Sequence, residues 1–299
     1  MKHNRLKTKS DKIFDLTMAG VPTAFFIILF LLPCIAGLFF SLTNFGGYSL
    51  KFDFVGLYNY KKLFNDAAFW KSIVNFILLY VGTVVVCFPL AMISAIALVK
   101  NKRIRERNFY RILFFFPSTV PMLIIAIMWM TMYNPSFGVL NTMLQAIGLD
   151  PVQWLADSKV VMISVIIIVV WRQFGFYLVY FMAAVSNVPK DIYEAAMIDG
   201  ASEVRQAFSI TIPLIWDVVR TSMLFYLQSA LMLGFNVIYI VTRGGPDHAS
   251  EIISSYMFEK MTTELDYGLA SAVGVIMLVV TMVMAVLISK LMKRETYEL

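Results

Sequence analysis

The sequence predicts an all-α membrane protein with six transmembrane helices and both termini in the cytoplasm. The first observation is the composition. Of 299 residues, 60% are hydrophobic and only 15% are charged, whereas an average soluble domain holds about 25% charged and ~45–50% apolar residues. The second observation is a set of six long apolar runs, and the third is the uneven distribution of Lys and Arg around them. This composition excludes an ordinary soluble enzyme and a disordered chain.

Each apolar run is long enough to cross ~30 Å of hydrocarbon as a helix. None shows the alternating pattern of barrel strands, and in lipid only helices and closed barrels satisfy the backbone hydrogen bonds. Prolines inside the first three runs predict kinked helices, with hinging as the functional alternative. The predicted spans are 17–42, 73–99, 112–132, 160–185, 218–242 and 269–292, which form one domain over 17–292 between tails at 1–16 and 293–299.

The basic residues predict the orientation of these spans. Sixteen of the 25 Lys and Arg residues lie in the two tails and in the loops 100–111 and 186–217, and seven lie in the alternate loops. The positive-inside rule therefore places both termini in the cytoplasm. The loop 186–217 holds only two of the sixteen, so its cytoplasmic placement follows from the parity of the spans. The first run is too long for the apolar part of a signal peptide, and we expect it to be retained.

Few residues are available for catalysis or metal binding. The two cysteines, Cys34 and Cys87, lie in apolar runs, and the two histidines, His3 and His248, are far apart. A disulfide framework, a metal site and a catalytic cluster are therefore not expected. No Gly-x-x-x-x-Gly-Lys-Ser/Thr sequence is present, so no phosphate-binding loop is predicted.

The loop 186–217 holds the most informative segment. Pro189 and the acidic residues after it favour the start of a short helix, and Gly200 permits a reversal of the chain after it. A second helical piece follows, and Pro213 marks the return to the membrane. A short helix with a small-residue surface, held beside a membrane, suits docking to a rigid cytoplasmic partner.

The spacing in this loop is specific. Glu-Ala-Ala is followed by Gly four residues after the second Ala, and then, after nine residues, by Ile-x-apolar-Pro. This pattern resembles the coupling-loop motif of binding-protein-dependent ABC importer permeases, except that Ile212 stands where Leu is usual. The residues that the resemblance assigns to coupling with an ATPase are Glu194, Ala195, Ala196, Asp199, Gly200, Ile210 and Pro213.

Other segments extend the resemblance over nearly the whole chain. They are 54–60 after the first span, 111–121 at the third, 242–246 after the fifth and 267–272 at the start of the sixth. Together they resemble the carbohydrate branch of the family, the maltose, glycerol-phosphate and multiple-sugar type. The fold implied is that of a type I ABC importer permease.

The resemblance also implies the partners. They are a second, usually different permease subunit, two cytoplasmic ATPase subunits that use ATP and Mg, an extracytoplasmic solute-binding protein, a sugar and the membrane lipid, with no nucleic acid. We expect this chain to bind no cofactor, to have no catalytic residue and to lie in the cytoplasmic (inner) membrane of a bacterium or archaeon. The alternatives are an ion-coupled carrier, although no Asp or Glu lies deep in a span, and a membrane scaffold, which would not need the loop motif.

Polar residues within the spans are the candidates for the substrate pathway. Arg172 is charged near the middle of the fourth span, where ionisable groups face a cavity or a partner. It could bind a carboxylate of an acidic sugar, pair with an acidic residue of the other permease, or have a structural role. Polar residues in the fifth span could contact solute or join helices. The candidates, partly from family spacing, are Arg172, Gln173, Phe176, Gln228, Ser229, Leu231 and Asn236.

A turn signal follows the fifth span at Gly244-Gly245-Pro246. The resemblance suggests a loop that contacts the binding protein. A simple helix end is the alternative interpretation.

Overall fold

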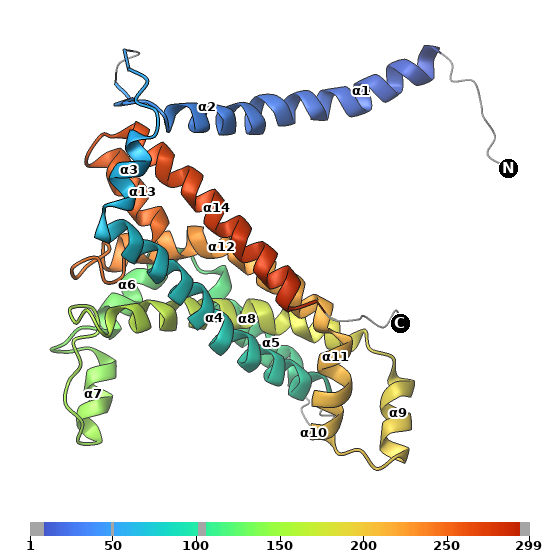
Figure 1. The fold of residues 1–299 in the computed structure, drawn as a ribbon. Helices are drawn as coiled ribbons and strands as arrows, with labels where there is room; N and C mark the ends of the chain where they lie inside the picture. The colour runs from blue at the N-terminus through green and yellow to red at the C-terminus, as the bar shows by residue number, and fades with distance from the viewer. Residues whose placement is uncertain (1–8, 49–50, 101–105, 294–299) are drawn as a thin grey trace. The chain divides into compact units, whose positions relative to one another are not determined.

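The computed structural model describes residues 9–48, 51–100 and 106–293, with side chains from Thr17 onward. In these ranges the chain is helical, and its only β pairing is the isolated bridge between Thr43 and Phe54. The chain divides into two compact units, Met1–Asn65 with Met257–Ile276, and Asp66–Tyr256 with Met277–Leu299. Figure 1 shows their helices. The predicted basic segments at 1–8 and 101–105, and most of the tail 293–299, lie outside the described residues.

The first unit begins with one long apolar helix. Its parts are α1 (Lys9–Phe26), a π-helical turn (Ile27–Leu31) and α2 (Leu32–Phe40). Helix therefore begins inside the stretch 1–16 that was predicted as a tail. The π turn surrounds Leu29, whose carbonyl would accept from residue 33 in a regular α-helix. Because residue 33 is proline and has no N–H, the helix widens at this point instead of breaking.

A short helix, α3 (Tyr58–Phe64), follows a turn that Asn59 holds in place. The buried Asn59 amide donates to the carbonyls of Ser41 and Thr43 at 2.9 and 2.8 Å. Phe40, Phe45 and Phe52 pack together beside it, with ring centroids 4.5 to 5.7 Å apart. The sequence did not predict this helix, because seven residues are too few for a clear helical period.

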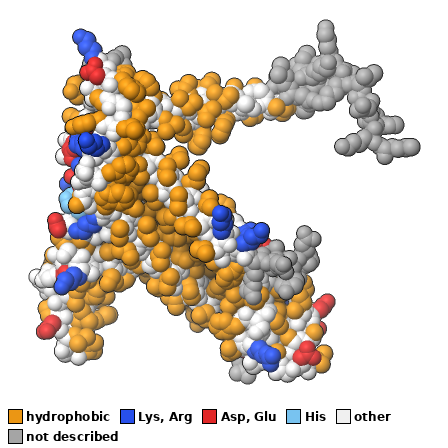
Figure 2. Space-filling view, viewed as in Figure 1, with side chains coloured by type: hydrophobic (Ala, Val, Ile, Leu, Met, Phe, Trp, Pro, Cys, Tyr) orange, Lys and Arg blue, Asp and Glu red, His pale blue; other side chains and the backbone are white. Residues whose placement is uncertain are grey.

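The second unit contains the helices that form the core. They are α4 (Ala67–Lys100), α5 (Arg107–Thr119), α6 (Met122–Met132), α7 (Val139–Ala146), α8 (Val161–Ser186) and α12 (Trp216–Val241). α4 packs along α8, and α12 packs against α4, α6 and α8. Phe88 of α4 meets Tyr177 of α8 with ring centroids 4.4 Å apart, and Tyr80 stacks on Tyr226 of α12 at 5.5 Å. Figure 2 shows hydrophobic side chains over most of the visible surface of these helices.

Two further helices, α13 (Ile253–Thr262) and α14 (Tyr267–Leu291), each contribute to both units. Among the described residues, five helices are long and apolar enough to cross a membrane: Thr17–Phe40, Ala67–Lys100, Val161–Ser186, Trp216–Val241 and Tyr267–Leu291. The first helix begins at Lys9, eight residues before the predicted start of its span. The other bounds differ from the predicted ones by six residues at the start of the second span and by no more than two elsewhere. The helices α7 and α13 were not predicted, because each is short and lies in a loop.

The third predicted span, 112–132, is not one kinked helix. α5 and α6 meet at an angle of 96° across a two-residue break. Val120, which precedes Pro121, is extended with ψ of 136°, because the proline ring disfavours the α conformation in the residue before it. With this pair counted as one span, the part of the chain that the structure describes has six.

Candidate functional site

A cavity of about 820 Å³ lies among α5, α8 and α12. Five of the seven candidates for the substrate pathway line it: Arg172, Gln173, Phe176, Gln228 and Ser229. Those on α8 share one face, because residues four apart lie one above the other on a helix. Ser229 gives its hydroxyl hydrogen to the carbonyl of Tyr226 in its own helix, whereas the exposed Gln228 amide makes no hydrogen bond with a described residue.

Two candidates lie outside this cavity. The carbonyl of Leu231 accepts a hydrogen bond from Ser254 at 3.2 Å, so this part of α12 faces the start of α13. Asn236 is half-buried further along α12 and is not among the lining residues. Gly234, two residues before Asn236, is buried against Leu79 and Ile252.

Sequence reasoning missed several lining residues. Tyr180 and Phe225 are partly exposed aromatic residues that face the cavity. Tyr180 follows Arg172 and Phe176 at intervals of four, so the helical period could have identified it. Ser118 and Thr119 line the cavity because α5 ends there, at the break that the sequence did not predict.

Arg172 is the charged residue of the cavity. One guanidinium nitrogen donates to Oε1 of Gln173 at 3.1 Å, and another reaches the carbonyl of Ser118 at 3.5 Å. The third nitrogen, Nε, is buried and has no hydrogen-bond partner among the described residues. None of the residues that line the cavity is acidic.

The loop 186–217 folds as two short helical pieces. Helix α9 (Lys190–Ile198) begins after Pro189, and Gly200 reverses the chain with φ of +75°, a conformation that favours glycine. α10 (Glu203–Gln206), a π turn (Ala207–Thr211) and α11 (Ile212–Leu214) follow. This π turn surrounds Ser209, four residues before Pro213, as the first π turn surrounds Leu29. The predicted helix–glycine–helix arrangement is therefore present, and α12 begins at Trp216.

Two side-chain contacts hold α9 in place. The Lys100 ammonium at the end of α4 lies over the Tyr193 ring, 3.7 Å from its centroid. The Tyr193 hydroxyl is 3.1 Å from Oγ1 of Thr211, which also donates to the carbonyl of Gln206. Burial raises the pKa of Tyr193, so its phenol stays neutral. Tyr193 thereby joins α9 both to a membrane-spanning helix and to the second piece of the loop.

The loop exposes apolar residues on either side of the chain reversal at Gly200. Met197 and Ile198 at the end of α9 are 60% and 87% exposed, and Val204 and Phe208 beyond the reversal are 68% and 63% exposed. Within α9 only Ala196 is buried. The Glu194 and Asp199 side chains are exposed beside these residues, and Ile210 and Pro213 are half-buried. We call Met197, Ile198, Val204 and Phe208 the apolar tip, a surface suited to another protein.

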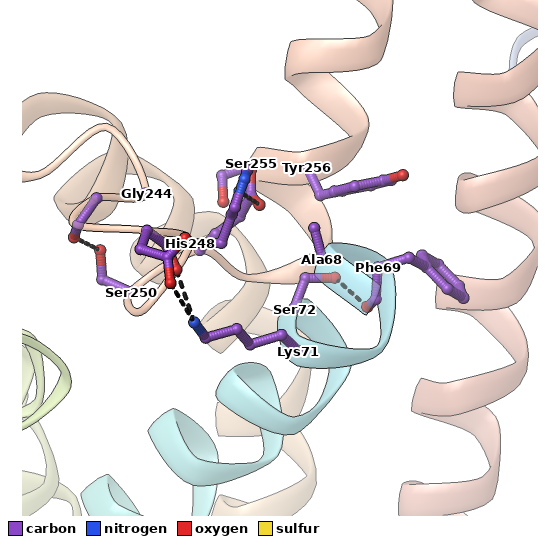
Figure 3. Close-up of polar contacts among 12 residues, drawn as sticks. Ala68, Phe69, Lys71, Ser72, Gly244, His248, Ser250, Ser255 and Tyr256 are labelled. Carbon is purple, nitrogen blue, oxygen red and sulfur yellow. Dashed lines mark hydrogen bonds and ion pairs between the residues drawn. The ribbon is translucent and has the colours of Figure 1, made fainter. Parts of the chain in front are cut away.

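The turn after α12 is held by side chains from the residues that follow it and from α4. Gly244 has φ of +82°, and a Cβ there would lie 3.2 Å from Cβ of Glu251. Ser250 donates to the carbonyl of Gly245 at 2.7 Å, and its own N–H donates to the carbonyl of Gly244. Figure 3 shows Lys71 of α4 reaching this turn, where it pairs with Asp247 at 3.7 Å. The turn containing Gly244, Gly245 and Pro246 is therefore a fixed surface.

A second set of contacts fixes the same turn. The Asn75 amide of α4 donates to the carbonyls of His248 and Glu251 at 3.0 and 2.8 Å. The His248 ring lies 2.7 Å from the buried Glu251 carboxylate. Among the described residues, no group of three or more His, Cys, Asp or Glu side chains could hold a metal ion.

Comparison with known proteins places the chain in a family. Residues 87–296 match the model of the binding-protein-dependent transport system inner membrane component. A diacetylchitobiose uptake system permease protein of Streptomyces coelicolor is 37% identical, over 95% of this chain and 84% of the relative. A trehalose/maltose transport system permease protein of Thermococcus litoralis is 31% identical over 93% of both chains.

The fold is similar to that of a solved importer. In the crystal structure of a bacterial ABC transporter that imports the acidic polysaccharide alginate, one chain superposes with a TM-score of 0.82, covering 97% of this chain and 98% of that one at 23% identity. The family model covers most of the chain, and the relatives align over nearly all of it. This chain is therefore a member of the binding-protein-dependent transport system inner membrane components, the multi-pass permeases of ABC importers.

Proposed function

We propose that this chain is a sugar-translocating permease subunit that takes up a sugar or an oligosaccharide. The observation that carries the proposal is the loop 186–217, which connects α8 to α12. It places an Ala-rich helix and the apolar tip at the ends of these two helices, which line the cavity. The relatives named above are permeases for disaccharides, which supports a sugar as the solute. We also propose that both termini and this loop lie in the cytoplasm.

In this proposal the apolar tip docks on a cytoplasmic ATPase subunit. The chain binds no nucleotide and hydrolyses no ATP, and ATP and Mg are used by two ATPase subunits. When the ATPase subunits close, α9 moves, and the contacts of Tyr193 with Lys100 and Thr211 pass the movement to α4 and α12. Tilting these helices opens the cavity to one side of the membrane and then to the other.

The remaining partners are proposed from the family. A second, different permease subunit would complete the path. An extracytoplasmic solute-binding protein would deliver the sugar onto the fixed turn at Gly244-Gly245-Pro246, because a surface that is ordered before binding loses less entropy on docking. Lys71 and Asn75 keep this turn in one conformation.

Reconstitution tests this function directly. The chain is co-expressed with candidate partner permeases and ATPases, and ATP hydrolysis is measured in liposomes. We expect stimulation that requires both the binding protein and a sugar. Uptake driven by an ion gradient without any ATPase subunit would contradict the proposal.

Tyr193 provides a finer test of coupling. Tyr193→Ala removes both the ring under Lys100 and the hydroxyl beside Thr211, so we expect fewer sugar molecules transported per ATP hydrolysed, by about tenfold for a loss of ~1.4 kcal/mol. Tyr193→Phe keeps the ring and loses one hydrogen bond of about 1 kcal/mol, so its transport ratio should fall less. If the two variants transport the same amount per ATP as the wild type, Tyr193 does not carry the coupling.

A further inference from the structure

Arg172 is a positive charge in the middle of an apolar helix. α8 has 26 residues and is a candidate membrane span, and Arg172 and Gln173 lie near its centre. A charge at this depth costs about 2.5–3.5 kcal/mol on insertion scales, and such residues normally face a cavity or a charged partner. In this chain it faces the cavity among α5, α8 and α12.

The described residues do not neutralise the charge of Arg172. Arg172 forms no ion pair with any described carboxylate, and its two hydrogen bonds go to the Gln173 amide oxygen and, at the limiting distance of 3.5 Å, to the Ser118 carbonyl. A guanidinium has five N–H donors in a planar fork, and here the Nε–H is buried with no acceptor among the residues that the structure describes. A purely structural arginine would have these donors occupied by carbonyls at the end of α5. The unpaired donor and the uncompensated charge call for an anionic acceptor.

The contrast with an arginine in another span, Arg220, supports this interpretation. Arg220 of α12 pairs with Asp217 at 3.3 Å, three residues earlier in the same helix. In α12 the helix itself therefore supplies the counter-charge for its arginine. Beside Arg172 the cavity instead provides Gln173, Gln228 and the aromatic rings of Phe176, Tyr180 and Phe225.

These groups are the ones that an acidic sugar needs. A carboxylate, sulfonate or phosphate can accept two parallel hydrogen bonds from a guanidinium. Amide side chains bond to hydroxyl groups, and aromatic faces pack against the C–H faces of sugar rings. A volume of about 820 Å³ lies within the ~300–1,000 Å³ range of small-molecule sites.

We propose that the solute of this permease is an acidic saccharide, whose anionic group binds Arg172 as it passes through the cavity. The inference rests on the proposed function and adds the chemical class of the solute. Gln173 orients the guanidinium, and Phe176 and Tyr180 hold the ring next to the charged group.

The test compares charged with neutral sugars. The complex with its binding protein in liposomes is supplied with four probes: maltotriose, chitotriose, trigalacturonate and glucose 6-phosphate. We expect ATP-dependent uptake of a charged probe, and the carboxylate and phosphate probes distinguish the two anionic groups. Arg172→Gln should lower that uptake at least tenfold, and Arg172→Lys should give an intermediate value because it keeps the charge and loses the fork. Arg220→Gln is the matched control and should not discriminate between charged and neutral probes.

The outcomes separate the two proposals. Uptake of neutral probes alone contradicts the acidic solute and leaves the sugar permease standing. An equal loss of charged and neutral uptake in Arg172→Gln, with an unchanged melting temperature, also contradicts it and assigns Arg172 to the partner permease. If no probe is taken up or stimulates ATP hydrolysis, the proposed function itself fails.

Discussion

Replacing Gly175 by leucine should prevent the second unit from folding and abolish transport. α5 crosses α8 at this glycine, and a Cβ there would overlap the main-chain carbonyl of Phe114 and lie 2.7 Å from Cα of Phe115. The obstruction is backbone, so no side-chain rotation relieves it. Close approach of backbones at small residues is a general means of packing helices in lipid.

The cavity depends on the same crossing. Phe115, Ser118 and Thr119 of α5 line it opposite Arg172 and Phe176, which flank Gly175 on α8. Separating α5 from α8 by the width of a side chain would therefore disrupt the cavity as well as the packing of the two helices. Overpacking costs about 1–3 kcal/mol even for a methyl group, so Gly175→Ala should already lower the unfolding midpoint by about 5 °C, at ~2–4 °C per kcal/mol.

The matched control is Gly37→Leu. Gly37 also lies within an apolar helix, α2, but a Cβ there meets no atom within 4 Å. The measurements are the melting temperature in detergent and the amount of monodisperse protein. If Gly175→Leu purifies and melts like Gly37→Leu, the close crossing of α5 and α8 is not required.

The sequence predicted the spans because each one is a long apolar run, so the hydropathy is averaged over many residues. Val161–Ser186 and Trp216–Val241 begin and end within two residues of the predicted bounds. The break between α5 and α6 was harder to predict, because a proline in a membrane helix either kinks it or ends it. Pro89 lies inside α4 without interrupting it, whereas Pro121 follows an extended residue at a 96° bend. Whether a proline kinks or ends a membrane helix depends on the hydrogen-bond donors that neighbouring helices bring to the freed carbonyls. A single sequence does not contain that information.

The candidate site was predictable to a similar degree. Arg172, Gln173 and Phe176 were found because a charge in an apolar run is conspicuous and the helical period supplies its neighbours. The contacts of Tyr193 were not predicted, since Lys100 and Tyr193 are 93 positions apart and no local pattern connects them.

Replacing Ile198 by aspartate should lower both transport and sugar-stimulated ATP hydrolysis without affecting the fold. Ile198 is 87% exposed at the end of α9, so it contributes little to the stability of this chain. If the apolar tip docks on the ATPase, a carboxylate at its most exposed point would be buried without a partner. Losing such a contact costs at least ~2 kcal/mol, which is about thirtyfold in affinity. Transport and sugar-stimulated ATP hydrolysis should both fall by at least tenfold.

Ile198→Leu is the control for this prediction, because leucine keeps the apolar surface and nearly the same volume. It should transport like the wild type, and both variants should melt at the wild-type temperature. Copurification of the ATPase subunits measures docking separately from activity, and we expect it to weaken for Ile198→Asp alone. Full transport by Ile198→Asp would show that the apolar tip lies outside the ATPase interface. In that case its exposed side chains Met197, Val204 and Phe208 must be covered by lipid or by another protein, because four large apolar residues together do not remain in water.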